Sequence, residues 1–115
     1  MLTKEEFQKL LRSGPLLLDG ATGSNLQKAG MPRGCCTEHW VLAHPETLVM
    51  LQRKYVEAGS RILYAPTFQA QPIALAREGL ESHTESINAQ LVALSRSVSK
   101  DVLVAGNFHS LHLIN

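Results

Sequence analysis

Three short apolar runs divide the chain into repeating units, and their spacing limits the fold more than any other feature. The runs occupy residues 15–19, 61–65 and 101–106, and the strands that they predict begin near positions 16, 61 and 102. Each run is short, continuous and bounded by turn-forming residues, which is typical of a strand buried on both faces of a sheet. The intervals leave room for a crossover helix each time, so we expect parallel, right-handed connections. The sequence therefore predicts an α/β fold.

Helix signals surround these runs. Thr3 and Glu6 form a capping box that opens a short N-terminal helix, and Gly14 is a natural stop for it. We expect this helix to cover one end of the domain. Pro45 suits the first turn of a second, clearer helix, which Gly59 ends.

The remaining helix signals are weaker. Residues 25–29 predict one or two helical turns and residues 73–77 predict a short helix, whereas residues 31–43 show no clean period. A second capping box at residues 82–85 opens a longer helix. The apolar face expected for this helix consists of Ile87, Leu91, Leu94 and Val98.

Composition bounds the class of function. Eleven lysines and arginines against ten aspartates and glutamates give a formal net charge of +1, which gives no support to a nucleic-acid partner. No apolar run approaches the roughly 20 residues of a membrane-spanning helix, so we expect no membrane partner. The N-terminus lacks the profile of a signal peptide, so we expect a cytoplasmic protein.

The first candidate site follows the first apolar run, where the sequence is Asp19-Gly20-Ala21 and then Thr-Gly-Ser. An aspartate at a strand end can hold an amine, and small residues after it let backbone N–H groups approach an anion. Such a loop is able to bind both ends of an amino acid. Two alternatives stay open: a strand-to-helix turn capped by Asp19, and a nucleotide-binding loop over residues 20–24. The second is weaker, because the loop is shorter than the dinucleotide fingerprint and lacks the lysine of a P-loop.

Thr67 and Phe68 form a second candidate at the end of the second apolar run. Thr67 offers a hydroxyl group to a ligand, and Phe68 offers an apolar wall. With similar weight, the segment is a simple turn with Phe68 in the core.

The two cysteines, Cys35 and Cys36, are adjacent, which disfavours a disulfide between them. Cys36-x-x-His39 is a weak metal pattern, because zinc needs more protein ligands than this pair and histidine supply. We interpret the cysteines as a structural pair of small residues. His109 and His112 lie in a C-terminal segment without a decisive pattern, and we interpret them as unrelated to each other.

Residues 17–27, which read Leu-Leu-Asp-Gly-Ala-Thr-Gly-Ser-Asn-Leu-Gln, resemble the opening of the homocysteine S-methyltransferase domain. That domain forms the N-terminal part of cobalamin-dependent methionine synthase and is the fold of betaine–homocysteine methyltransferase. Later features agree in order: His-Pro-Glu at residues 44–46, Pro-Thr-Phe at residues 66–68 and Val-Ala-Gly at residues 104–106. The resemblance extends from about residue 15 to residue 106.

The resemblance implies a (β/α)8 TIM barrel, of which this chain would hold the N-terminal three strand–helix units and a short N-terminal helix. A whole barrel takes roughly 250 residues. The implied chemistry is methyl transfer to the thiol of homocysteine, which gives methionine. The resemblance also implies a zinc ion, held by three cysteines, that would keep the substrate sulfur as a thiolate. The methyl donor differs between members (a methylcorrinoid, a betaine or a methylsulfonium compound), so corrinoid or folate modules are implied partners.

The same resemblance assigns roles by position. It places Asp19 on the amino group of homocysteine and the backbone N–H groups of Gly20 and Ala21 on its carboxylate. It places Thr67 and Phe68 in the wall of the substrate pocket. No catalytic residue is carried over to this chain.

The zinc cysteines of the family lie late in the barrel, one after strand six and a Gly-Gly-Cys-Cys pair after strand eight. Cys35 and Cys36 resemble that pair in letters only, so we expect no zinc ligand in this chain. Residues 107–112 also depart from the small residues usual after strand three. We expect residues 1–115 to be one partial domain that is inactive alone. The alternative is a non-catalytic α/β module that associates with itself or with another chain.

Overall fold

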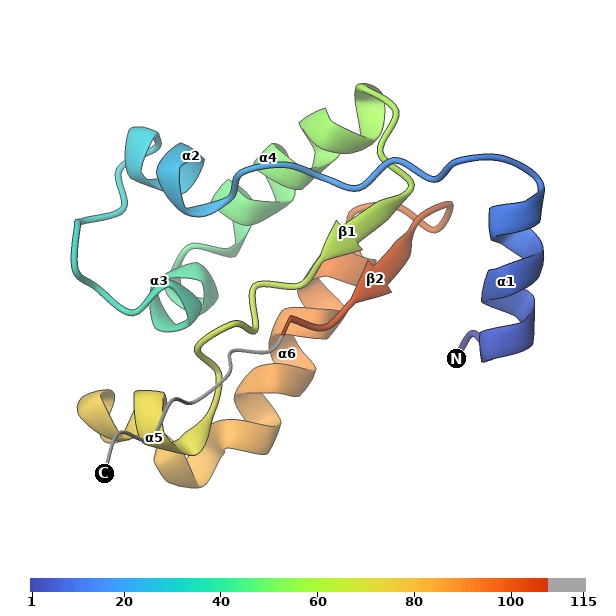
Figure 1. Cartoon of the computed structure of the whole chain (residues 1–115). Coiled ribbons are helices and arrows are strands. Elements are labelled where there is room, and N and C mark those ends of the chain that lie inside the picture. Colours follow the sequence, from blue (N-terminus) through green and yellow to red (C-terminus); the bar gives the residue numbers. More distant parts are fainter. Residues whose placement is uncertain (108–115) are drawn as a thin grey trace, which may run out of the picture.

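A computed structural model describes residues 1–107 of the chain, in which helices flank a small parallel sheet (Figure 1). The strands are β1 (Ile62–Tyr64) and β2 (Leu103–Ala105), with Leu63 opposite Val104. The helices are α1 (Lys4–Arg12), α2 (Gly23–Lys28), α3 (Thr37–Ala43), α4 (Pro45–Glu57), α5 (Pro72–Leu75) and α6 (Thr84–Arg96), with short 3-10 turns η1 (Ala76–Glu78) and η2 (Glu81–His83). The α/β class and the parallel pairing of the second and third apolar runs are confirmed.

Two of the helix starts follow their sequence signals. The Thr3 hydroxyl accepts a hydrogen bond from the Glu6 N–H at 3.1 Å, and the Thr3 N–H donates to the Glu6 carboxylate at 2.8 Å. This reciprocal pair is the predicted capping box of α1. Pro45 occupies the first turn of α4, where its missing N–H leaves no carbonyl unsatisfied.

The main core lies among the helices rather than against the sheet. Helices α2, α3, α4 and α6 turn their apolar faces toward one another, and the segment around α5 closes one side (Figure 1). We call this set the helical core, and it consists of Leu26, Met31, Val41, Leu48, Ala70, Leu75, Ile87 and Leu91.

The first apolar run differs from its prediction. Leu18 forms only an isolated parallel bridge to Ile62, although backbone hydrogen bonds from Arg61 to Leu17 and from Asp19 to Ile62 keep the segment beside β1. Leu17 is 57% exposed and Leu18 is 48% exposed, so the segment is not buried on both faces. Within residues 1–107, no further strand pairs with the outer side of this segment.

The segment at residues 31–43 is not irregular throughout, because its second half forms α3. This helix has seven residues, which is too short for a hydrophobic period to emerge from the sequence. Tertiary packing stabilises it instead, through Val41 in the helical core.

The second predicted capping box does not form. His83 precedes α6 without a side-chain cap, and the Thr84 hydroxyl donates backwards to the Glu81 carbonyl at 2.7 Å. The chain enters α6 directly from η2, so no residue there adopts the extended backbone that an N-cap requires.

Helix α1 stands to one side of the sheet and buries no residue completely (Figure 1). Between α1 and the strands lies an apolar groove of about 620 Å³, lined in part by Leu2, Phe7, Leu18 and Ile62. No helix within residues 1–107 is long and apolar enough to cross a membrane. His109 and His112 lie outside the described residues.

Candidate functional site

Asp19 lies where the first apolar run leaves the side of β1. Its carboxylate accepts a hydrogen bond from the Tyr64 N–H at 3.2 Å, and its own N–H donates to the Ile62 carbonyl at 3.0 Å. Partial burial raises the pKa of Asp19 above its usual range, and the hydrogen bond from Tyr64 opposes part of that rise. Because Tyr64 is the last residue of β1, the Asp19 carboxylate lies at the carboxyl end of the strands, which is the usual place for ligands in α/β folds.

The loop after Asp19 is held by a side chain from α4. The Tyr55 hydroxyl donates to the Ala21 carbonyl at 2.8 Å, and the Asn25 amide donates to the same carbonyl at 2.9 Å. A Cβ atom on Gly20 would lie 2.9 Å from the Tyr55 ring, so any side chain at that position would force the ring to shift. No hydrogen bond from the Gly20 or Ala21 N–H is formed within residues 1–107.

Thr67 is buried and joins the ends of the two strands. Its hydroxyl accepts from the Asn107 N–H at 2.9 Å and donates to the Asn107 carbonyl at 3.1 Å. The single hydroxyl hydrogen is thus already engaged, so Thr67 shapes the strand ends before it contacts any ligand.

A cavity of about 310 Å³ opens at these strand ends, between the start of α3 and the segment after β1. Phe68 is 41% exposed and contributes to its wall. Asp19, Gly20 and Ala21 lie beside this cavity rather than in its lining, since the loop enters the wall only from Thr22 onward. The lining residues are Thr22, Gly23, Cys35, Thr37, Glu38, Tyr64, Ala65, Pro66, Phe68, Gln69 and Asn107.

Glu38 is the residue that sequence reasoning missed. It stands in the first turn of α3, is only 2% exposed and lines the cavity. Its carboxylate accepts from the Gln69 N–H at 3.0 Å and from the Cys36 thiol at 3.6 Å. Prediction of α3 would have been needed to find it, because Glu38 faces inward only when the segment is helical.

The cysteine pair points in two directions. The Cys35 thiol donates to the Pro32 carbonyl at 3.1 Å, whereas the Cys36 thiol donates to Glu38. Burial raises the pKa of Cys36, and the negative charge of Glu38 raises it further.

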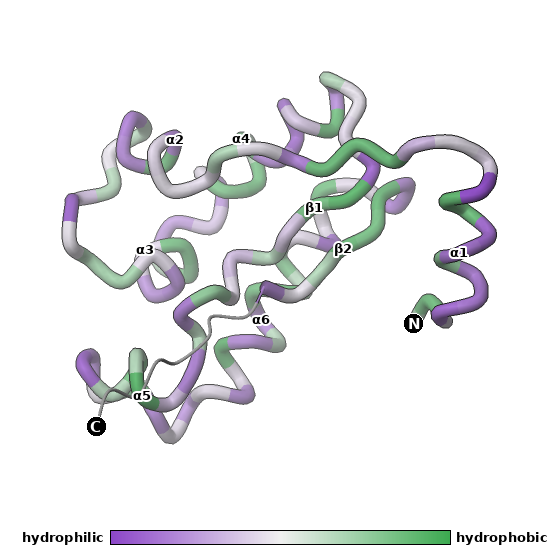
Figure 2. Tube along the Cα trace, viewed as in Figure 1, coloured by the Kyte–Doolittle hydropathy of each residue, from purple (hydrophilic) through white to green (hydrophobic). Residues whose placement is uncertain are grey.

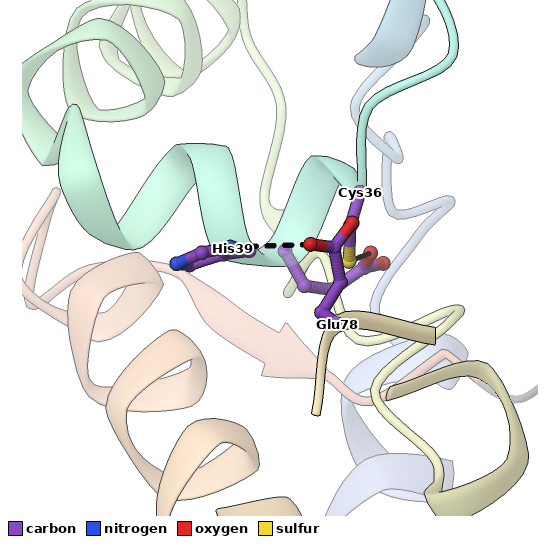
Figure 3. Close-up of polar contacts among 4 residues, drawn as sticks. Cys36, His39 and Glu78 are labelled. Atoms are coloured by element: carbon purple, nitrogen blue, oxygen red, sulfur yellow. Dashed lines mark hydrogen bonds and ion pairs between the residues drawn. The ribbon is translucent and has the colours of Figure 1, made fainter. Parts of the chain in front are cut away.

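His39 faces Glu78 rather than the Cys36 thiol, as Figure 3 shows, with 3.9 Å between His39 Nδ1 and Glu78 Oε2. Within residues 1–107, no three histidine, cysteine or acidic side chains come together in a way that could hold a metal ion. The described residues therefore do not fit the zinc centre implied by the resemblance.

These features define a small α/β fold whose candidate ligand-binding residues lie at the carboxyl ends of parallel strands. The model of the homocysteine S-methyltransferase family matches residues 16–111. The chain belongs to the homocysteine S-methyltransferase family.

Individual relatives agree with this family. The S-methylmethionine–homocysteine S-methyltransferase BHMT2 of Pongo abelii is 33% identical over 107 residues, which make up 90% of this chain and 28% of the relative. The metallated form of the homocysteine methyltransferase MmuM from Escherichia coli has a TM-score of 0.77 and 25% identity, covering 87% of this chain and 40% of MmuM. Its oxidized form has a TM-score of 0.75 and 26% identity, covering 89% and 40%. The chain thus spans less than half the length of these relatives.

Proposed function

We propose that the chain is the N-terminal part, three strand–helix units, of a TIM-barrel enzyme that transfers a methyl group to the thiol of homocysteine and yields methionine. The observation that carries the proposal is the family match over residues 16–111. It is supported by the position of Asp19 at the carboxyl end of the strands, where such barrels bind their substrates. We place the enzyme in the cytoplasm.

We assign the residues present to binding the amino-acid end of homocysteine. Asp19 would accept hydrogen bonds from the substrate ammonium group. The N–H groups of Gly20 and Ala21 would donate to the substrate carboxylate, and the absence of internal partners within residues 1–107 supports this assignment. Phe68 would form an apolar wall, and Thr67 would hold the strand ends in place.

The metal and the methyl donor belong to the whole enzyme. A related enzyme has been solved in a metallated form, and the metal we expect is zinc, which would hold the thiol of homocysteine deprotonated. Residues 1–107 do not assemble a site for it. The name of the Pongo abelii relative favours a methylsulfonium donor over a methylcorrinoid or a folate-linked module.

A binding experiment on the full chain tests this proposal. Homocysteine is titrated into isotope-labelled protein, and amide shifts are followed by NMR. We expect shifts at Gly20 and Ala21 that the Asp19→Asn variant loses and that Asp101→Asn, a change at an exposed residue, retains. Methionine formation is assayed in parallel with S-methylmethionine and is expected to be absent. Failure of homocysteine to shift residues 19–21 would contradict the proposal.

A second candidate function is self-association without catalysis. The half-exposed Leu17 and Leu18 and the apolar groove of about 620 Å³ favour it, because an uncovered strand edge is a template for pairing with another strand. The partner would be a second copy of this chain. Sedimentation over a hundredfold concentration range tests it: dimers that Leu17→Lys dissolves support self-association, and a monomer throughout contradicts it.

A further inference from the structure

Glu38 presents an electrostatic problem that the described chain does not solve. Glu38 is only 2% exposed, yet it forms no ion pair with any lysine, arginine or histidine of residues 1–107. Its two partners, the Gln69 N–H and the Cys36 thiol, carry no positive charge. Buried carboxylates are normally paired with a cation or a metal, because an uncompensated charge is costly to remove from water.

The cavity beside Glu38 offers space for the missing cation. Within the described part of the chain, Glu38 is the one charged residue in the lining, and no cationic side chain opposes it. The hydroxyl groups of Thr22 and Thr37 provide further polar contacts, while Pro66 and Phe68 provide apolar ones. A volume of about 310 Å³ is at the small end of ligand sites and suits a molecule of amino-acid size.

We propose that Glu38 binds the cationic group of a small organic ligand in this cavity, either an alkylammonium or a methylsulfonium. An organic cation fits better than a metal ion, because one carboxylate cannot supply a coordination sphere and, within residues 1–107, no three acidic, histidine or cysteine side chains gather in a way that could hold a metal. This inference rests on the proposed function in one respect: both place the ligand at the carboxyl ends of the strands. It adds an anionic residue, separate from Asp19, that selects ligands by charge.

The test compares charged probes with neutral molecules of similar size on the full wild-type chain. The probes are n-butylammonium and trimethylsulfonium, and the neutral controls are n-butanol and dimethyl sulfide. Binding is followed by NMR shifts of the Glu38 and Gln69 amides. We expect each cation to bind at least about tenfold more tightly than its neutral control, the size of one charge-assisted contact.

Two variants locate the charge. Glu38→Gln keeps the shape and an acceptor for the Gln69 N–H, so we expect the preference for cations to disappear. Glu57→Gln removes an exposed carboxylate at the end of α4 and is expected to retain the preference. If Glu38→Gln does not fold, the comparison of cations with neutral probes on the wild-type chain decides alone.

The outcomes separate this inference from the proposed function. Equal binding of charged and neutral probes, or a preference that survives in Glu38→Gln, overturns the role of Glu38. Cation binding that depends on Glu38, without any homocysteine binding, upholds the inference and contradicts the proposed function. Tighter binding of butylammonium assigns the site to a substrate amine, and tighter binding of trimethylsulfonium assigns it to a methyl donor.

Discussion

The helical core and the segment formed by α1 and residues 15–19 both contain apolar residues, but these residues differ in burial. Figure 2 shows hydrophobic stretches along both. In the helical core, Leu26, Leu48 and Leu91 have no exposed surface. Leu17 and Leu18 are about half exposed, and α1 has no buried residue.

The difference teaches that an apolar run becomes a core only where a second element covers it. Helices α2, α3, α4 and α6 surround the helical core, so the apolar face of each helix is buried by the other helices. Residues 15–19 have β1 on one side and no further strand on the other within residues 1–107. Stability should therefore be concentrated in the helices, and the first strand segment should depend on its few polar attachments.

The largest expected effect compares one leucine from each region. Leu48→Ala removes a fully buried side chain and should lower the free energy of unfolding by about 2–5 kcal/mol, because it leaves a cavity among the helices. Leu18→Ala should cost less than about 1 kcal/mol, because its side chain is already half exposed. Urea denaturation followed by circular dichroism measures both. Equal losses would show that the two regions are packed alike.

The second effect lies where the two regions meet, at the contact between Gly20 and Tyr55. Gly20→Ala places a methyl group 2.9 Å from the Tyr55 ring and should destabilise the protein by about 1–3 kcal/mol. Gly23→Ala, which meets no atom within 4 Å, is the matched control and should change stability by less than about 1 kcal/mol. In a Tyr55→Ala background the cost of Gly20→Ala should vanish. A cost that persists there would place the strain elsewhere.

The sequence was sufficient for the elements whose signals are local. The capping box at Thr3, the proline at position 45 and the valine-rich third run each predicted an element that the structure contains. The sequence was insufficient where the structure depends on burial by, or packing against, other elements. The exposure of Leu17 depends on whether another element packs against residues 15–19. The formation of α3 depends on the packing of Val41 in the helical core.

The candidate site divides in the same way. Asp19 could be predicted as a strand-end residue because its position follows from the run before it. Glu38 could not, because its burial depends on α3 and on the Gln69 N–H, which lies 31 residues away in sequence. The role of Thr67 as a tie to Asn107 was also hidden, since it joins two strand ends. The roles of Asp19, Gly20, Ala21, Thr67 and Phe68 in substrate binding stay predictions.

A smaller effect tests how the negative charge of Glu38 influences the neighbouring thiol of Cys36. In a Cys35→Ser background, which leaves Cys36 as the only thiol, Glu38→Gln removes a negative charge that raises the pKa of Cys36. Alkylation by iodoacetamide near pH 8 should become roughly threefold to tenfold faster, because the thiolate fraction rises when the pKa of Cys36 falls. The midpoint of the rate against pH should move down, whereas Glu78→Gln should leave it in place. A higher plateau with an unchanged midpoint would indicate greater exposure of the thiol instead.

The smallest effect concerns the open strand segment and its pH dependence. Because the pKa of Asp19 is raised in the folded protein, the folded state holds this proton more tightly than the unfolded state does. The free energy of unfolding should therefore fall as pH rises from the ordinary aspartate pKa of about 3.9 through the raised folded value, and level off above it. Asp19→Asn keeps an acceptor for the Tyr64 N–H but cannot ionise, so its stability relative to wild type should increase over that window. Urea denaturation of both proteins between pH 4 and pH 7 measures the difference. A relative stability that stays constant with pH would mean that residues 15–19 leave the carboxylate as well hydrated as it is in the unfolded chain.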